Sequence, residues 1–324
     1  MGEGGRAFWT VAAGRGELRP VPPAAAGPGE VAVRTLHSGI SRGTETLVFR
    51  GLVPEDEHQR MRCPHQEGAF PFPVKYGYAA VGRVEDGPAE LRGRIVFCLH
   101  PHQERFVAAA AAVTPVPAAV PARRAVLAAN VETAVNALWD SPVLPGQRVA
   151  VVGAGVVGAA VALLAGRIPG TAVTLVDLDA RKEALAAALG VAFASPGTAP
   201  ADCDAVFEAS GAPDGLVTAL ALAGTEAVVT VLSWYGARPA TLPLGHAFHS
   251  RRLTLRCSQV GQVAPAQRPR WSYGRRLALA LDLLADPAFD HLLTGESRFA
   301  DLPETMRRLA DAPDGTLCHV VHYP

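Results

Sequence analysis

Three glycines at positions 153, 155 and 158 form the most specific chemical pattern in the chain. They lie in Val149-Ala-Val-Val-Gly153-Ala-Gly155-Val156-Val157-Gly158, between an apolar stretch and an Ala-rich one. A G-x-G-x-x-G spacing in this context predicts a strand-to-helix turn whose backbone, including Val156 and Val157, binds the pyrophosphate of a dinucleotide. Gly153 allows the tight turn, Gly155 lets the backbone approach the pyrophosphate, and Gly158 lets the helix pack on the strand.

A carboxylate stands at the end of the next apolar stretch. Asp177 follows Val176 and lies 19 residues beyond Gly158. A carboxylate there accepts hydrogen bonds from the adenosine ribose hydroxyls and repels a 2′-phosphate. We therefore expect NAD as the cofactor, with NADP as the less favoured alternative because Arg181 is close in sequence.

The glycine pattern belongs to an alternation of strands and helices. Strands are predicted at 149–152, 172–176, 205–208, 227–232 and 253–256, and helices at 156–166, 180–189 and 213–222. This alternation is typical of a doubly wound parallel sheet, an α/β fold of the Rossmann type. Residues 149–166 carry no charge and approach the length of a membrane span. Because three glycines interrupt them, we expect a buried strand and helix instead.

Composition limits the possible partners and compartment. The 324 residues include 30 basic and 30 acidic side chains, so the formal net charge is zero and neither nucleic acid nor membrane is expected as a partner. All the basic residues except Lys75 and Lys182 are arginine. The five cysteines are scattered without a CxxC pair, which indicates neither disulfides nor a thiolate zinc cluster. We expect a reduced, cytoplasmic protein.

Several further motifs give the chain a resemblance that covers nearly its whole length. They are Gly27-Pro-Gly-Glu30-Val31, Ser38-Gly-Ile-Ser-Arg-Gly-Thr-Glu45, Gly77-Tyr-Ala-Ala-Val-Gly82, Glu132-Thr-Ala134 and Val206-Phe-Glu-Ala-Ser-Gly211. With the glycine pattern, they resemble the medium-chain dehydrogenase/reductase superfamily, the zinc alcohol dehydrogenase-like proteins. Three stretches resemble more narrowly the branch that contains bacteriochlorophyllide dehydrogenase: 73–78, 129–134 and 258–261. The resemblance implies a GroES-like, mostly-β catalytic domain at 1–130 and 263–324, with the Rossmann domain at 131–262.

The positions that hold the catalytic zinc in this superfamily differ here. The family uses a Cys after Gly-Ile, a His in a Gly-His-Glu turn, and a later Cys or Asp. This chain has Ser41 (Arg42 or Gly43 if the turn is shifted), Tyr78 and approximately Ala129. These residues do not make a tetrahedral zinc set. The structural zinc lobe retains only Cys98.

We expect no other metal site either. The remaining candidate ligands are His37, the Cys63–His65 pair and the His100–His102 pair. Short His/Cys spacings of this kind can bind metals. However, a proline separates the two members of each pair and splays them, and no further ligand completes a set.

Hydride transfer without zinc needs another group that polarises the carbonyl and moves a proton. Our hypothesis is Tyr78, which stands at a zinc-ligand position, with Lys75 lowering the pKa of its phenol through a nearby positive charge. Glu132 and His65 are second-line candidates, and Thr44 and Ser41 are candidates for relaying the proton. The alternatives stay open that Tyr78 only fills the former metal cavity and that Lys75 is a solvated loop charge.

The resemblance also implies contacts with the cofactor beyond the glycine turn. Arg42 is similar to the family's pyrophosphate-binding Arg, and Thr133 to its nicotinamide-packing Thr. Ser210 follows the fourth strand of the nucleotide domain, and the loop Leu232-Ser233-Trp234 follows the fifth and is expected to pass the nicotinamide carboxamide.

Taken together, these residues predict an NAD(H)-dependent, zinc-independent oxidoreductase. It would interconvert an alcohol, in that branch a secondary one, and a carbonyl in a small-molecule substrate. One alternative is reduction of a conjugated double bond, as in zinc-free quinone and enoyl reductases. Another is a non-catalytic NAD(H)-sensing binding protein. The resemblance further implies a homodimer through the edge strand near 253–258.

Overall fold

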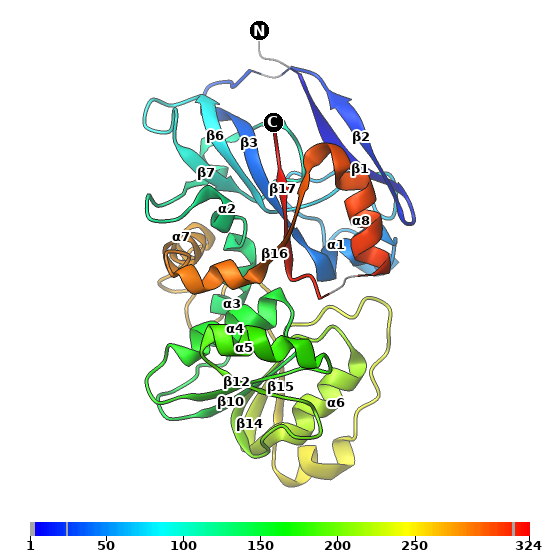
Figure 1. Cartoon of the computed structure of the whole chain (residues 1–324), viewed down its shortest axis with the longest axis vertical. Coiled ribbons are helices and arrows are strands. Elements are labelled where there is room, and N and C mark those ends of the chain that lie inside the picture. The colour runs from blue at the N-terminus through cyan, green and yellow to red at the C-terminus, as the bar shows by residue number, and fades with distance from the viewer. Residues whose placement is uncertain (1–3, 24, 313–314) are drawn as a thin grey trace. The chain divides into compact units, whose positions relative to one another are not determined.

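The computed structural model describes residues 4–23, 25–312 and 315–324. The chain divides into two compact units (Figure 1). Unit 1 comprises Met1–Ala129, Leu281–Asp286 and Leu293–Pro324, and unit 2 comprises Asn130–Ala280 and Pro287–Leu292. The domain limits expected from the resemblance, 1–130 with 263–324 and 131–262, differ from these at residue 130 and at residues 263–280 and 287–292, all of which belong to unit 2.

Unit 2 is built on a parallel sheet, which confirms the predicted α/β class. Among its described residues, six strands pair in the order β12-β11-β10-β13-β14-β15. Their bounds are β10 Arg148–Val152, β11 Ala172–Val176, β12 Ala192–Ala194, β13 Cys203–Glu208, β14 Ala223–Val231 and β15 Thr254–Cys257. The strand order reverses direction between β10 and β13. In such sheets, ligands bind beyond the carboxyl ends of the strands at the point of reversal.

Helices cover both faces of this parallel sheet. The helices of unit 2 are α3 (Ala128–Asp140, whose first two residues belong to unit 1), α4 (Val156–Gly166), α5 (Glu183–Leu189), α6 (Pro213–Leu222) and most of α7 (Tyr273–Leu283). Right-handed crossovers through α4 and α5 run toward β12, and the crossover through α6 runs toward β15, so α6 lies on the opposite face (Figure 1). The helix predicted from 180 begins with a 3-10 turn at Ala180–Lys182 and ends at Gly190, which adopts φ +72°.

The uncharged stretch at 149–166 forms most of β10 and all of α4, as predicted. Within β10, Val149 to Val152 are buried, and α4 buries most of its residues. No helix among the described residues is long and apolar enough to cross a membrane.

Unit 1 is mostly β, which confirms the second part of the predicted fold class. In its described part, one sheet has the order β16-β17-β3-β6-β7-β9, with β8 paired to β3, and a second has the order β2-β1-β5-β4. The strand bounds are β1 Gly5–Ala12, β2 Arg15–Val21, β3 Glu30–Ser41, β4 Glu67–Gly68, β5 Val74–Lys75, β6 Ala80–Asp86, β7 Ile95–Cys98, β8 Arg105–Ala109, β9 Val113–Pro115, β16 Leu293–Arg298 and β17 Cys318–His322.

Short helices complete unit 1. They are α1 (Arg42–Phe49), α2 (Ala122–Ala125) and α8 (Leu302–Asp311). A core of aromatic and aliphatic side chains, including Phe8, Ile40, Phe49 and Met306, fixes α1 and α8 against the strands. This packing holds the junction between β3 and α1, where Ser41, Arg42 and Thr44 lie.

In the turn between β10 and α4, the backbone at Gly153 lies very close to the backbone at Gly158. Gly153 adopts φ +104°, and a Cβ on Gly158 would lie 1.9 Å from the Gly153 carbonyl oxygen. A Cβ on Gly155, in contrast, would meet no atom within 4 Å. Gly153 and Gly158 are therefore required by the fold, whereas the space beside Gly155 is open to a ligand.

We expect Gly158→Ala to destabilise the protein, because the added methyl group must displace the Gly153 backbone. The free energy of unfolding should fall by about 1–3 kcal/mol, the usual effect of overpacking. Urea denaturation measures this change. Gly155→Ala is the matched control, and its stability should remain within about 0.5 kcal/mol of the wild type. Equal stability of the two variants would contradict the proposed packing role of Gly158.

Candidate active site

The turn after β10 is tied directly to the carboxylate after β11. The Gly153 amide donates to the Val176 carbonyl at 2.8 Å, and the Ala154 amide donates to Oδ2 of Asp177 at 2.7 Å. Oδ1 of Asp177 accepts from the Asp179 amide at 2.9 Å. The glycine turn and the carboxylate predicted to select NAD thus lie side by side at the carboxyl end of the sheet.

The amino end of α4 starts immediately after this turn. Gly155 is the N-cap residue, and Val156 and Val157 form the first helical turn. Backbone amides at such an end have no partner within the helix and carry partial positive charge. Together with the open space beside Gly155, this arrangement suits a phosphate group.

A buried carboxylate organises the neighbouring strand ends and was not predicted. Glu208, the last residue of β13, is fully buried. Its Oε1 accepts from the Ser210 amide at 2.8 Å and the Ser210 hydroxyl at 2.5 Å, and its Oε2 accepts from the Tyr235 hydroxyl at 2.6 Å. The sequence signal for it was an acidic residue directly after the apolar stretch 205–207. Burial raises the pKa of Tyr235, and the hydrogen bond to Glu208 raises it further.

The loop after β14 joins the same region. The hydroxyl of Ser233 accepts from the Gly211 amide at 2.8 Å, and the Leu232 amide donates to the Glu208 carbonyl at 2.8 Å. Trp234 follows and is half-buried. The predicted cofactor residues Ser210, Leu232 and Ser233 therefore meet at adjacent strand ends, close to Gly153, whose added Cβ would lie 2.5 Å from the Ser210 backbone.

Thr133 and Arg42 lie on two different helices. Thr133 is half-buried in α3, and Arg42 is the first residue of α1, also half-buried. Arg42 belongs to unit 1 and Thr133 to unit 2. Their roles toward a cofactor stay predictions.

Glu132 has a structural partner that the sequence did not reveal. Arg276 on α7 is 1% exposed and donates from Nε to Oε1 of Glu132 at 3.0 Å. The same guanidinium donates to Oδ1 of Asn136 at 2.5 Å, to the Gln262 carbonyl at 3.2 Å and to the Val260 carbonyl at 2.5 Å. Burial raises the pKa of Glu132, and the charge of Arg276 opposes that shift. Glu132 thus holds α3 to α7 as one partner of a buried ion pair.

Tyr78 belongs to a polar cluster in unit 1. The hydroxyls of Ser41 and Thr44 form hydrogen bonds with its phenol, and their role in relaying a proton stays a prediction. Glu45, which is 3% exposed, lies close enough for its charge to act on the phenol and accepts from the Ser41 amide at 2.8 Å. Burial raises the pKa of Tyr78, and Glu45 raises it further. The phenol is therefore protonated at neutral pH.

The expected effect of Lys75 on Tyr78 is wrong, because the pKa of the phenol is raised and not lowered. Lys75 is 2% exposed, so it is no solvated loop charge either. Its ammonium group donates to Oε1 of Glu67 and, at 2.6 Å, to Oε1 of Gln103. Glu67 stands opposite Lys75 in the β4–β5 pair. The lysine therefore fixes the small sheet to the chain around Gln103.

His65 contacts a different set of side chains. His65 is exposed, and its backbone adopts φ +56°. Its ring centroid lies 5.1 Å from that of His100, and its Nε2 lies 4.0 Å from Sγ of Cys98. A role for His65 in proton transfer stays a prediction.

The three positions that the resemblance compares with zinc ligands carry no Cys, His, Asp or Glu side chain. Ser41 and Tyr78 bond to each other through their hydroxyls, and Ala129 has no donor atom. Within residues 4–23, 25–312 and 315–324, no group of three or more His, Cys, Asp or Glu side chains is placed to hold a metal. Both ring nitrogens of His102 are engaged, by Ser38 at 2.7 Å and by Glu45 at 2.7 Å.

The stability of Arg276 variants tests whether Glu132 serves as the structural partner of a buried ion pair. Arg276→Leu leaves the carboxylate buried without its partner, so the free energy of unfolding should fall by about 3–5 kcal/mol. Arg275→Leu makes the same change of charge at the exposed neighbouring position and should cost less than about 1 kcal/mol. Chemical denaturation measures both. If Arg276→Leu proves as stable as the wild type, the anchoring role of Glu132 is wrong.

The fold is shared with solved dehydrogenase structures. L-idonate 5-dehydrogenase from Escherichia coli has a TM-score of 0.82 at 16% identity, with 99% of each chain covered. Acetophenone reductase from Geotrichum candidum, in complex with NAD, has a TM-score of 0.78 at 18% identity, and the match covers 99% of this chain and 98% of that one. A proposed zinc-binding dehydrogenase from Sinorhizobium meliloti, bound to NADP, has a TM-score of 0.79 at 18% identity, with 99% of each chain covered.

The sequence matches no protein-family model and none of the curated proteins compared with it. The structural likeness, at these low identities, therefore establishes the fold alone, which this chain shares over almost its whole length with these solved structures.

Proposed function

We propose that this chain is an NAD(H)-dependent, zinc-independent oxidoreductase that interconverts an alcohol, in particular a secondary alcohol, and a carbonyl compound. The observation that carries the proposal is the Gly153–Gly158 turn, with its open space at Gly155 and its direct bond to Asp177. That combination provides a site for a pyrophosphate and a carboxylate for the adjoining ribose. The named activities of the structural neighbours, idonate dehydrogenase and acetophenone reductase, support the same reaction class.

The preference for NAD over NADP rests on Asp177. Its carboxylate would repel a 2′-phosphate and accept bonds from ribose hydroxyls. NADP and NAD both occur in the neighbours, so the proposal depends on this residue of the present chain.

Zinc independence rests on the donors present at the three family positions. Catalytic zinc in proteins takes three side-chain ligands from Cys, His, Asp or Glu and keeps a fourth position open. Ser41, Tyr78 and Ala129 supply no such ligand, and the two hydroxyls already bond to each other. The proposed reaction therefore uses side-chain groups of this chain in place of a metal ion.

Tyr78 is the group that we propose to move the proton. A bound NADH supplies the hydride for the carbonyl carbon. As negative charge develops on the carbonyl oxygen, the neutral phenol of Tyr78 donates its proton to that oxygen. The hydroxyls of Ser41 and Thr44 stabilise the resulting phenolate by hydrogen bonding, which is the direction of their effect on the pKa of Tyr78. In the oxidative direction the phenolate takes the proton back.

Tyr78→Phe tests this mechanism. We expect kcat for carbonyl reduction to fall by about 100-fold or more, since the proton donor is lost. The affinity for NADH, measured by fluorescence titration, should stay unchanged because the cofactor residues of unit 2 are intact. The assay follows NADH absorbance over a panel of ketones and aldehydes, with NADPH in parallel.

Tyr76→Phe is the matched control, since Tyr76 is buried and its ring lies 6.0 Å from that of Tyr78 in an edge-on arrangement. Wild-type turnover in the Tyr78→Phe variant would contradict the role of Tyr78 as proton donor. It would favour reduction of a conjugated double bond, which needs little acid assistance. Tight NADH binding with no turnover on any substrate would favour a non-catalytic, NAD(H)-sensing protein.

We also propose that two copies associate through β15. This strand is the last in the parallel sheet of unit 2, and all four of its residues are exposed. An unpaired edge offers backbone donors and acceptors to a second strand. Light scattering should give a mass of twice the 33.8 kDa of one chain. The Leu255→Asp variant should have the mass of a single chain. Leu144→Asp changes another exposed leucine of unit 2 and should leave the dimer intact. A monomeric wild type would contradict the proposal.

A cytoplasmic location belongs to the same proposal. The five cysteines are free thiols, three of them buried. Unpaired thiols are typical of reducing compartments.

A further inference from the structure

The turn that follows β11 carries an arginine that bears on the choice between NAD and NADP. Arg181 lies four residues after Asp177, in the 3-10 turn Ala180–Lys182. In proteins that bind NADP at such a strand end, a nearby arginine receives the 2′-phosphate. The planar fork of donors on a guanidinium group fits a phosphate and a carboxylate alike. A side chain that would favour NADP is therefore present in this chain.

Asp179 occupies the guanidinium group of Arg181. Its Oδ1 accepts from Nε of Arg181 at 2.8 Å, and its Oδ2 accepts from Nη2 at 2.9 Å. The Arg181 amide also donates to Oδ1, at 3.1 Å. Two parallel bonds from one guanidinium to one carboxylate form the bidentate arrangement that gives such pairs their geometric specificity. A carboxylate of the chain thus fills the fork that a phosphate would fill.

The turn itself fixes the Asp179 carboxylate. Asp179 is the N-cap residue of the 3-10 turn, and its backbone amide donates to Oδ1 of Asp177 at 2.9 Å. Its side chain is 27% exposed, whereas that of Arg181 is 76% exposed. The bonds from Arg181 hold the pKa of Asp179 below its usual range, so the carboxylate is ionised at neutral pH. Asp179 is therefore the anchored member of the pair, and Arg181 reaches it from the solvent side.

The effect of this ion pair concerns a ligand more than the stability of the fold. An exposed pair of this kind contributes little to stability. It does cancel the charge of Arg181, and it adds a second carboxylate to the turn that carries Asp177. A 2′-phosphate at the end of β11 would have to displace Asp179 from the guanidinium group before it could bond to Arg181.

We propose that Asp179 determines nucleotide specificity together with Asp177, because it holds Arg181 in an ion pair and so keeps it from the 2′-phosphate of NADP. The inference rests on the proposed function, in which the end of β11 binds the adenosine ribose. Asp177 acts on the ribose hydroxyls directly, whereas Asp179 is a positioning residue that acts through Arg181. Loss of the Asp179 charge should therefore open the site to NADPH even with Asp177 in place.

Fluorescence titration with NADPH and with NADH tests the proposal without any substrate. Asp179→Asn keeps a good N-cap side chain of similar size but removes the charge that holds Arg181. We expect the affinity for NADPH to rise by about tenfold, since a charged hydrogen bond to the phosphate becomes available. The affinity for NADH should stay unchanged. A merely structural role for Asp179 would change both affinities alike, and that result overturns the proposal.

Asp202→Asn is the matched control for the loss of charge. Asp202 forms a similar exposed pair with Arg148, at 2.8 Å, and directly precedes β13 at the amino end of the sheet. The control should change neither affinity. An equal gain in NADPH affinity in this variant would show that net charge alone is responsible, and would overturn the role of Asp179.

A double variant identifies the side chain that receives the phosphate. Adding Arg181→Gln to Asp179→Asn should abolish the gain in NADPH affinity, because the released guanidinium group is then missing. A gain that persists in the double variant overturns the proposal. It would point instead to Lys182, whose charge also acts on Asp179.

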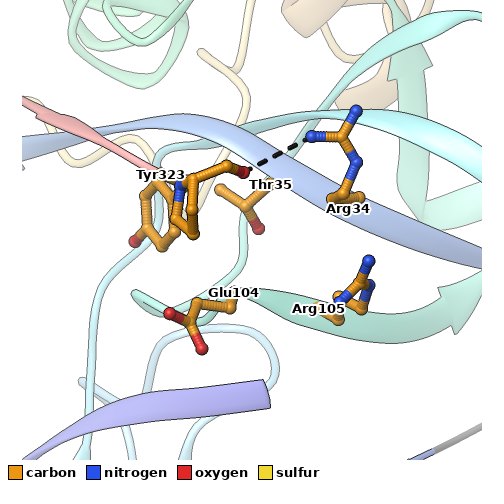
Figure 2. Close-up of a pocket in the computed structure, with 6 residues that line it drawn as sticks. Arg34, Thr35, Glu104, Arg105 and Tyr323 are labelled. Carbon is orange, nitrogen blue, oxygen red and sulfur yellow. Dashed lines mark hydrogen bonds between the residues drawn. The ribbon is translucent and has the colours of Figure 1, made fainter. Parts of the chain in front are cut away.

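A second pair of arginines tests whether the phosphate binds at the proposed place. Arg34 and Arg105 lie on one side of a pocket of unit 1 that has a volume of about 450 Å³ (Figure 2). Both donate from Nε to Glu85, at 3.1 and 3.3 Å. Arg34→Gln in the Asp179→Asn background should keep the gain in NADPH affinity. Loss of the gain would place the phosphate in this pocket and overturn the proposal.

The binding measurements are independent of the proposed reaction. If the wild-type protein binds NADH but turns over no substrate, the proposed reaction fails, whereas the titrations still decide the role of Asp179. A wild type that binds NADPH as tightly as NADH overturns the inference about specificity. One that binds neither nucleotide overturns both.

Discussion

A charged or polar group that leaves water must find a partner inside the protein, and this constraint shapes both units. In unit 2 the guanidinium of Arg276 satisfies it by joining Glu132, Asn136 and two backbone carbonyls, which holds α3, α7 and the chain at 260–262 together. Glu208 satisfies it by fixing the strand ends that surround the glycine turn. In unit 1 the Glu45–His102 pair holds the junction of β3 and α1. The parts proposed to do chemistry are thus positioned by buried polar contacts as much as by apolar cores.

The features predicted correctly from the sequence are those encoded over short distances along the chain. The strand–turn–helix at 149–166 follows from local hydropathy and glycine spacing, and its contact with Asp177 follows from the geometry of parallel strands. The partners of buried charges follow no such rule. Arg276 lies 144 residues from Glu132, and His102 lies 57 residues from Glu45. Only the tertiary fold brings these pairs together.

The prediction that Lys75 lowers the pKa of Tyr78 failed for a clear physical reason. Its proximity to Tyr78 was inferred from a separation of three residues, a spacing that puts side chains on one face in a helix. Here Lys75 lies in a strand, where side chains alternate between the two faces. Its ammonium group therefore meets Glu67 across the strand pair and Gln103, while the phenol three residues on meets Ser41 and Thr44. The buried ammonium group of Lys75 thus serves the architecture of unit 1, which neither of the two expectations for this residue included.

The scarcity of lysine also has a practical consequence for chemical labelling. An acylating reagent that attacks side-chain amines meets only Lys75 and Lys182 in this chain. Lys75 is 2% exposed, whereas Lys182 is half-exposed at the start of α5. In the native protein the reagent should thus tag Lys182 almost alone among the side chains, which places a fluorophore in unit 2 without mutagenesis. Delayed tagging of Lys75 would then time how often the small sheet of unit 1 opens.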